Sequence, residues 1–180
     1  MIRPLYKFFF KLSGWKIKGD VPAVDKYVMI VAPHTSNMDF MVGLAARSIL
    51  RLDTKYLGKK ELFRFPFGWF FRYLGGYPVD RSRHTNMVEE VVKIFESHKK
   101  FSICIAPEGT RKYVKEWKTG FYQIALKARV PIVVVGFDYL EKEVSIAPLF
   151  FPTGNMEVDL EKIKQHYKSI SGKYPERGIR

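Results

Sequence analysis

KYVMIVAP, residues 26–33, and the HTSNMDF that follows it, residues 34–40, form the stretch of sequence that decides the fold. Its first half is a continuous apolar and largely β-branched run, which is typical of a strand buried on both faces of a sheet. Residues 36–50 then predict a helix, which Ser36 or Asn37 can cap and whose first turn holds Asp39. A buried strand, a polar turn and a helix make up the repeating unit of an α/β fold.

The same alternation continues along the rest of the chain. Further strands are predicted at 54–60, 76–81, 102–107, 131–140 and 143–150. Helices are predicted in the aromatic stretch after residue 60 and at 84–100, 119–128 and 156–170. We therefore predict an α/β fold, with residues 1–180 forming a single domain around a mixed, mostly parallel sheet flanked by helices.

Composition limits the classes of protein that this chain can belong to. It has 180 residues, of which 47% are hydrophobic, so it can bury a full core and is not a disordered chain. The net charge of +13 favours a polyanionic partner, which can be nucleic acid, an anionic lipid surface or a phosphorylated small molecule. The single cysteine, Cys104, excludes an internal disulfide, and its apolar neighbours indicate a buried strand residue.

No segment of the sequence is predicted to span a membrane, because none approaches the roughly 20 uninterrupted apolar residues that this requires. The most apolar segment, residues 61–79, is interrupted by Arg64, Pro66 and Arg72. Its aromatic run, residues 65–74, has two readings: packing in the core, or a platform at a lipid interface. YKFFFK near the N-terminus has the same basic and aromatic character, so residues 1–20 are a candidate membrane-surface segment.

His34 and Asp39 are candidates for acid–base chemistry. Both lie where a predicted strand ends and a helix begins, which is where sites gather in α/β folds. A neutral imidazole is a good general base near neutral pH, and a carboxylate on its far nitrogen fixes its tautomer. No protein nucleophile accompanies the pair, which fits deprotonation of a substrate hydroxyl or of water. The alternative is that His34 only caps a turn and Asp39 only caps a helix.

A second polar cluster, PEGTR at 107–111, follows another predicted strand. Gly109 allows close approach of the backbone, Thr110 offers a hydroxyl, and Arg111 offers a bidentate fork for phosphate. Glu108 can hold Arg111 or contact substrate hydroxyls. Arg81, at the end of GYPVDR, is a further candidate for binding phosphate, and a pair of lysines, Lys59 and Lys60, closes the strand at 54–60. Each of these charged residues also has a simpler reading as a solvated side chain.

Taken together, four blocks resemble the glycerophospholipid acyltransferase family, whose best-known members make phosphatidic acid from 1-acylglycerol-3-phosphate. The blocks are HTSNMD (34–39), GYPVDR (76–81), PEGTR (107–111) and VPIVVVG (130–136), in the order and spacing of the family. The resemblance implies a glycerol-phosphate acyltransferase-like fold. It also implies an O-acyltransferase that moves a fatty acyl group from a thioester to the hydroxyl of a lysophospholipid.

The resemblance also assigns roles to individual positions. His34 matches the catalytic base of the family, and Asp39 matches its orienting partner. The residues that match positions binding the glycerol-phosphate part of the acceptor are Glu108, Gly109, Thr110, Arg111 and Arg81. Lys59 matches the lysine of a lysine-rich strand end, with Lys60 as the competing match. Pro131 matches a proline that shapes the site.

The implied partners are a lysophospholipid acceptor, an acyl-CoA or acyl carrier protein donor, and an anionic membrane surface. No cofactor, metal ion or nucleic acid is expected. Because only 33 residues precede His34, we expect a short form without a long anchor, bound peripherally to the cytoplasmic face of the membrane. Met38 and Ala106 depart from the residues frequent in the family, and both neighbour the predicted site.

Three alternatives stay open from the sequence. The acceptor can be another lipid that carries a hydroxyl. A non-catalytic module that binds anionic lipid or nucleic acid also fits the charge and the aromatic content. A hydrolase can use His34 and Asp39 to activate water. The four histidines have no metal-ligand spacing, so no metal site is predicted.

Overall fold

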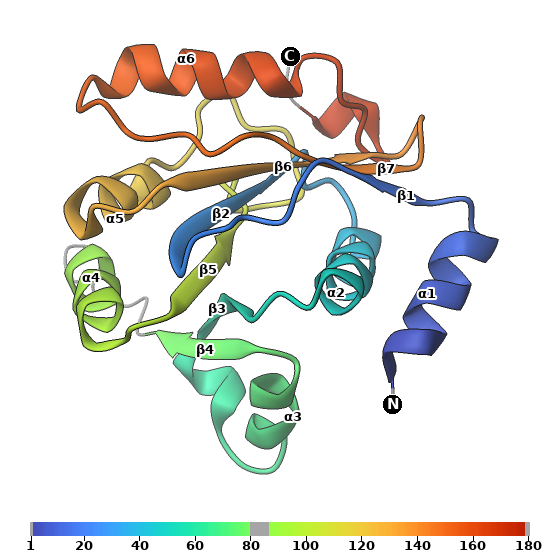
Figure 1. Ribbon diagram of the computed structural model, residues 1–180, viewed down its shortest axis with the longest axis horizontal. Coiled ribbons are helices and arrows are strands. Elements are labelled where there is room, and N and C mark those ends of the chain that lie inside the picture. Colours follow the sequence, from blue (N-terminus) through green and yellow to red (C-terminus); the bar gives the residue numbers. More distant parts are fainter. Residues whose placement is uncertain (1, 80–86, 179–180) are drawn as a thin grey trace.

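A seven-stranded sheet is the centre of the computed structural model, which describes residues 2–79 and 87–178 (Figure 1). The strand order is β1-β7-β6-β2-β5-β3-β4, and all neighbouring pairs are parallel except β6 and β7. The strands are β1 (Lys16–Lys18), β2 (Lys26–Ala32), β3 (Thr54–Lys59), β4 (Gly76–Val79), β5 (Phe101–Ile105), β6 (Ile132–Asp138) and β7 (Glu143–Ile146). The predicted α/β class with a mixed, mostly parallel sheet is confirmed.

Helices cover both faces of this sheet. They are α1 (Ile2–Leu12), α2 (Met38–Leu50), α3 (Gly68–Tyr73), α4 (Met87–Ser97), α5 (Gly120–Ala128) and α6 (Met156–Tyr167), with 3₁₀ turns η1 (Lys60–Phe63) and η2 (Pro175–Arg177). The helices α4, α5 and α6 pack on one face. The other face is covered by α1 and α2, with α3 beyond them at the edge formed by β3 and β4 (Figure 1).

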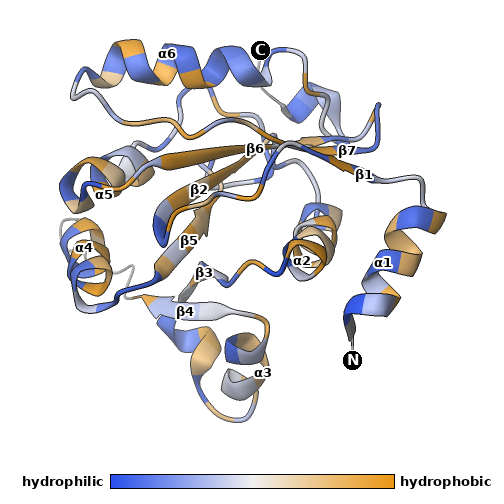
Figure 2. Ribbon diagram, viewed as in Figure 1, coloured by the Kyte–Doolittle hydropathy of each residue, from blue (hydrophilic) through white to orange (hydrophobic). Residues whose placement is uncertain are grey.

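The alternating side chains of β2 explain why its sequence is apolar throughout. Val28 and Ile30 enter the core under α4, α5 and α6, while Tyr27 and Met29 enter the core under α1 and α2. All four are at most 7% exposed, and β6 has the same two-sided burial, so both strands are strongly apolar in Figure 2. Each buried side chain of this size stabilises the fold by about 1.5–3 kcal/mol, which fixes these two strands at the centre.

The N-terminal elements were not predicted. Helix α1 packs against α2, and the short strand β1 pairs with β7, where Lys16 and Lys18 form ion pairs with Glu143. The sequence Lys-Ile-Lys of β1 contains no local strand signal, because it is short and two of its three residues are lysines. It forms a strand because it pairs with the edge of β7. At the second family block, β4 ends at Val79, and Arg81 lies outside the described residues.

The aromatic run after β3 is mostly exposed, so its reading as core is wrong for most of its rings. Phe63, just before the run, is only 6% exposed, and its ring lies where a Cβ at Gly58 or Gly76 would come within 2.7 Å. By contrast, the side chains of Phe65 and Trp69 are 96% and 70% exposed. Within the described part of the chain, no helix is both long and apolar enough to cross a bilayer.

Candidate active site

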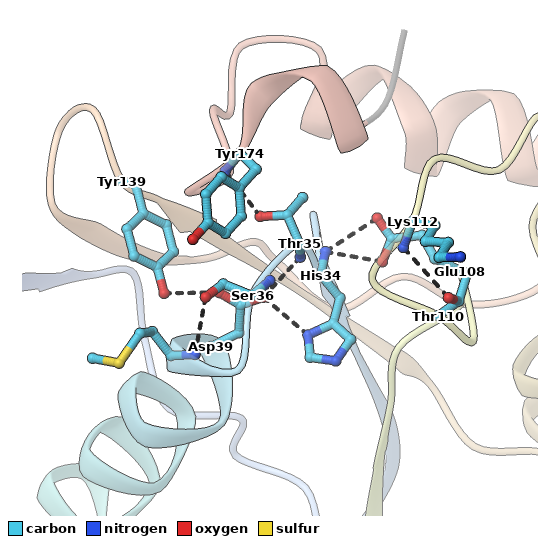
Figure 3. A network of polar contacts seen from close by, with 10 residues as sticks. His34, Thr35, Ser36, Asp39, Glu108, Thr110, Lys112, Tyr139 and Tyr174 are labelled. Atoms are coloured by element: carbon cyan, nitrogen blue, oxygen red, sulfur yellow. Dashed lines mark hydrogen bonds and ion pairs between the residues drawn. The ribbon is translucent and has the colours of Figure 1, made fainter.

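Three parallel strands bring polar side chains to one edge of the sheet. The strands β5, β2 and β6 are parallel neighbours, so their carboxyl ends lie together. The loop of His34 follows β2, the loop of Glu108 follows β5, and Tyr139 directly follows β6. Figure 3 shows side chains from all three segments joined in one network of polar contacts.

The predicted pair of His34 and Asp39 is in direct contact. His34 Nδ1 lies 3.0 Å from Asp39 Oδ2, and the imidazole is turned toward the carboxylate in Figure 3. This proximity follows from the local sequence, because His34 precedes α2 and Asp39 is in its first turn. Asn37 occupies the cap position without a side-chain bond, whereas the Ser36 hydroxyl accepts a hydrogen bond from the Met38 N–H.

Asp39 is buried and fully hydrogen-bonded. Only 2% of the residue is exposed. Its Oδ2 accepts from the backbone N–H groups of Thr35 and Ser36, each at 2.8 Å, and its Oδ1 accepts from the Tyr139 hydroxyl at 2.7 Å. With His34, four donors therefore converge on one carboxylate, which fixes its position relative to the imidazole.

These donors keep Asp39 ionised. Burial by itself raises the pKa of Asp39, but the hydrogen bonds from His34, Ser36 and Tyr139 outweigh it and hold the pKa below its ordinary value. An ionised carboxylate only accepts hydrogen bonds, so Nδ1 of His34 carries the hydrogen between the two residues. In the neutral imidazole this leaves Nε2 of His34 as the acceptor, on a side chain that is 21% exposed. The pair can act as a general base toward a ligand.

Tyr139 is a member of this network that the sequence analysis missed. Burial and its bond to Asp39 raise the pKa of the Tyr139 hydroxyl above its ordinary value, so it remains a donor. The ring of Trp15 contacts it edge-on at 5.0 Å between centroids. Its place at the end of a strand parallel to β2 was the available signal, but residues 131–140 were interpreted only as a strand.

Glu108 holds the loop that carries His34. Both of its carboxylate oxygens accept from the His34 backbone N–H, at 3.1 and 2.9 Å, and the residue is 4% exposed. Burial raises the pKa of Glu108 to about 7, only partly opposed by that hydrogen bond. From the sequence, this carboxylate was predicted to hold Arg111 or to contact substrate hydroxyls. In the structure it accepts hydrogen bonds from the backbone N–H of His34 instead.

This raised pKa predicts a dependence of stability on pH that Glu108→Gln removes. The ordinary glutamate value is 4.5, so between about pH 4.5 and 7 the folded protein keeps a proton that the unfolded chain has released. The stabilisation is full below that range and is lost as the pH rises through about 7, by on the order of 3 kcal/mol. We expect the free energy of unfolding of the wild type, minus that of the variant, to fall across this range in denaturant titrations. The same pH dependence of the free energy of unfolding in both proteins would contradict the raised pKa of Glu108.

Comparison with known proteins gives the family. A model of the family described as Acyltransferase matches residues 16–138 of the chain. The chain belongs to this acyltransferase family. Its curated relatives include the 1-acyl-sn-glycerol-3-phosphate acyltransferase of Saccharomyces cerevisiae, which is 33% identical over 67% of this chain and 41% of that protein. The 1-acyl-sn-glycerol-3-phosphate acyltransferase beta of Homo sapiens is 30% identical over 73% of this chain and 49% of that protein.

The fold is also that of a solved acyltransferase. The crystal structure of the 1-acyl-sn-glycerophosphate (LPA) acyltransferase PlsC from Thermotoga maritima superposes with a TM-score of 0.60. The two proteins are 20% identical, and the match covers 96% of this chain and 80% of that one. The matched segments cover 28–49% of the length of the curated relatives, so the chain spans less than half of each of these proteins.

In the block at 107–111, Pro107 and Glu108 are buried, whereas the following residues 109–111 form an exposed loop beside the pair. Gly109 has a φ of +66°, a conformation that glycine adopts without strain, and the Lys118 side chain runs against it. The Thr110 hydroxyl accepts a hydrogen bond of 3.4 Å from the Lys112 N–H, as Figure 3 shows. Arg111 is exposed on the same loop as Glu108, so its guanidinium is available to a ligand.

Two further predicted site residues are only partly described. Lys59 is the last residue of β3, which is parallel to β5, so its backbone lies at the same edge of the sheet as Glu108. Arg81 lies outside the described residues. Pro131 was expected to shape the site. Its carbonyl accepts a hydrogen bond from the Val28 N–H at the amino end of β6, which is the edge of the sheet opposite His34. The structure therefore does not bring Pro131 together with the other predicted site residues.

The C-terminal segment covers the back of the His34 loop. The backbone N–H of Tyr174 donates to Thr35 Oγ1 at 3.2 Å, and Thr35 is fully buried. A Cβ at Gly172 would come within 2.9 Å of the Thr35 side chain, so the segment is in close contact. This contact has no local signal in the sequence, because its two partners lie 139 positions apart.

Cys104 lies near the same edge of the sheet, in β5 as predicted. It is half-buried rather than buried, and burial of its thiol raises the pKa of Cys104 to about 12, so the thiol stays protonated. In the described ranges, no three His, Cys, Asp or Glu side chains lie close enough together to hold a metal ion. At this edge the described residues place an oriented imidazole beside a basic loop.

Proposed function

We propose that this protein transfers a fatty acyl group from a thioester to the hydroxyl of a lysophospholipid, with 1-acylglycerol-3-phosphate as acceptor and phosphatidic acid as product. The observation that carries the proposal is the contact of 3.0 Å between a partly exposed imidazole and a buried, fully hydrogen-bonded carboxylate. The names of the curated relatives support the choice of acceptor.

In the proposed step His34 acts as the general base and Asp39 orients it. Nε2 of His34 removes the proton from the acceptor hydroxyl as the oxygen attacks the thioester carbonyl carbon. A C–O ester bond forms, the C–S bond breaks, and the thiolate takes up the proton from the imidazolium. The Asp39 carboxylate stabilises the imidazolium while it exists. A thiolate is a good leaving group, so the step needs no covalent intermediate on the protein and no cofactor.

Basic residues are proposed to bind the phosphates of the two substrates. Arg111, on the exposed loop next to Glu108, is assigned to the phosphate of the acceptor together with Thr110, Gly109, Arg81 and Lys59. The donor is acyl-CoA or acyl carrier protein. The excess of positive charge over the chain, +13, suits substrates and a membrane surface that are all anionic.

We further propose that the protein acts while bound peripherally to the cytoplasmic face of a membrane, since both the acceptor and the product reside in lipid. Its +13 charge favours an anionic leaflet, which attracts basic segments by about 1 kcal/mol per cation near the surface.

Arg111→Ala is expected to weaken binding of the acceptor rather than to stop the chemistry. A guanidinium binds phosphate through charge-assisted, bidentate hydrogen bonds, so its loss should raise KM for lysophosphatidate by about 10- to 100-fold, with a smaller change in kcat. Arg111→Lys should recover only part of the loss. With a monoacylglycerol, which has no phosphate, wild type and variant should differ little. An unchanged KM for lysophosphatidate would remove Arg111 from the phosphate site.

A panel of acceptors and donors tests the proposed function. Purified protein is supplied with acyl-CoA or acyl carrier protein and with lysophosphatidate, glycerol-3-phosphate, lysophosphatidylcholine or no acceptor. We expect the highest kcat/KM with lysophosphatidate and no product without an acceptor. Release of fatty acid at equal rates with and without acceptor would identify a hydrolase instead, and no turnover with any pair would contradict the proposal.

A further inference from the structure

Exposed apolar side chains are concentrated on one face of the protein. Among the described residues, twenty large apolar or aromatic side chains are exposed, and thirteen of them belong to α1, α2 and the segment 60–75. They are Leu5, Phe8, Phe9, Leu12, Met38, Phe40, Met41, Leu62, Phe65, Phe67, Trp69, Phe70 and Tyr73. The helices on the opposite face have far fewer, so this is not a general property of the surface. Apolar patches of this extent mark an interaction surface.

The segment 60–75, which we name the aromatic hairpin, holds the most exposed of these rings. Phe65, Phe67 and Trp69 are 96%, 67% and 70% exposed. The backbone around them is held in place, because Arg72 donates to the Phe63 carbonyl and Tyr56 donates to the Phe71 carbonyl, each at 3.3 Å. Phe63 anchors the segment from inside. The exposed rings therefore project from a fixed support into the surroundings.

The charges on this face identify the kind of partner. The stretches 2–12 and 60–75 together contain six cations and one carboxylate, Glu61. The cations are Arg3, Lys7, Lys11, Lys60, Arg64 and Arg72. Basic side chains interleaved with aromatic rings match the boundary between anionic headgroups and acyl chains, where rings bury their apolar part and cations bind phosphate. A protein partner would not require so one-sided a charge.

The aromatic hairpin also adjoins the candidate active site. Phe40, next to Asp39 in sequence, contacts the Tyr56 ring edge-on at 5.6 Å between centroids. Tyr56 in turn donates its hydroxyl to Phe71 of α3, so two contacts lead from α2 to the aromatic hairpin. Met38 and Met41, in the first turns of α2, are 46% and 50% exposed. Tyr56 thus links the aromatic hairpin to the exposed apolar residues of α2 that follow His34.

We propose that the aromatic hairpin inserts its rings into an anionic lipid bilayer and, with α1, docks this face so that a lipid acceptor reaches His34 without crossing water. The inference deepens the proposed function and rests on it for the nature of the acceptor. The docking itself is a separate property, because it depends on rings that take no part in acyl transfer. A variant in which His34 is replaced, and which therefore cannot transfer acyl groups, should still bind to the bilayer.

The first test measures binding of the full chain to vesicles by sedimentation. Vesicles of phosphatidylcholine are compared with vesicles that also contain phosphatidylserine. The double variant Phe65→Ser, Phe67→Ser should lose at least about tenfold in its partition coefficient on the anionic vesicles. Phe151→Ser is the matched control, since Phe151 is 64% exposed and lies outside this face. It should bind as the wild type does. Equal binding of the double variant and the wild type would overturn the proposal.

The second test uses Trp69 as a reporter of insertion. Of the three tryptophans, Trp117 is buried, Trp15 is half-buried, and Trp69 is 70% exposed. Anionic vesicles should shift the emission of the wild type to shorter wavelength, and Trp69→Phe should abolish the shift. A shift that persists in Trp69→Phe would overturn the proposal.

Two controls separate this proposal from its rivals. His34→Ala should bind vesicles like the wild type, so a failure of the acyltransferase assignment does not affect the result. Light scattering without lipid should give the same mass for the wild type and the double variant. A dimer that the double variant disperses would assign the face to a second copy of the chain and would contradict docking on lipid.

Discussion

His34→Ala is expected to lower kcat for acyl transfer to lysophosphatidate by about a thousandfold or more, while the protein stays folded. General base catalysis contributes about 10²- to 10⁴-fold, and no other imidazole contacts Asp39 in the described part of the chain. The side chain is partly exposed and its Nδ1 bond is to Asp39, so its removal leaves no cavity deep in the core. KM for either substrate should change much less than kcat.

Steady-state kinetics, with circular dichroism to verify the fold, measure this effect. His98→Ala is the matched control, because His98 is exposed after the end of α4 and far from the carboxyl edge of the sheet in sequence and topology. It should retain full turnover. Normal turnover by His34→Ala would rule out His34 as the base, whichever acceptor is used.

Asp39→Asn is expected to have the second large effect, on both rate and stability. The amide has one acceptor oxygen, whereas the carboxylate accepts from Thr35, Ser36, Tyr139 and His34. An amide NH₂ facing any of these donors leaves buried groups unpaired, which costs on the order of 3 kcal/mol. If the amide donates to Nδ1 of His34, the imidazole is held in the wrong tautomer. If the amide forms no bond to Nδ1, the imidazole loses its orientation. We expect kcat to fall about a thousandfold or more.

Asp159→Asn provides the control that separates stability from catalysis. Asp159 is also buried and accepts from the Tyr122 hydroxyl and from the backbone and hydroxyl of Thr153, but it lies in α6 away from the His34 loop. Denaturant titration should show a comparable loss of stability in both variants. Turnover below the unfolding transition should fall only in Asp39→Asn. Wild-type kcat in folded Asp39→Asn would contradict its role as the orienting group.

The central part of the fold and of the site could be predicted because its signals are local. The apolar run of β2, the polar turn and the first turn of α2 are contiguous, so the approach of His34 to Asp39 needs only one strand-to-helix junction. The parallel arrangement of β2 and β5 then brings Glu108 to the same edge, as alternating strands and helices indicated. Residue spacing and the direction of the chain are sufficient for these inferences.

What the sequence did not reveal depends on contacts between distant segments. Tyr139 lies 100 residues from Asp39, and Glu108 lies 74 residues from the backbone N–H that it accepts from. Neither partner has a local signature, because a tyrosine after an apolar strand and a glutamate before a glycine occur in many settings. The contact of Tyr174 with Thr35 has the same character.

The aromatic segment after β3 could not be resolved from composition. Phe63 is buried and Phe65, two positions later, is almost fully exposed. Identical side chains in one short run differ because the 3₁₀ turn η1 directs Phe63 to the glycines of β3 and β4, while the following turn leaves the sheet. Hydrophobicity alone favoured burial for both.

One measurement tests the central claim most directly: the release of thiol from acyl-CoA, followed from the first turnover with and without lysophosphatidate. If His34 activates the acceptor hydroxyl for direct attack, thiol release depends on the acceptor, equals phosphatidic acid formed, and starts without a burst. Thiol release without acceptor, or a burst equal to the enzyme concentration, would contradict direct transfer by the His34–Asp39 pair.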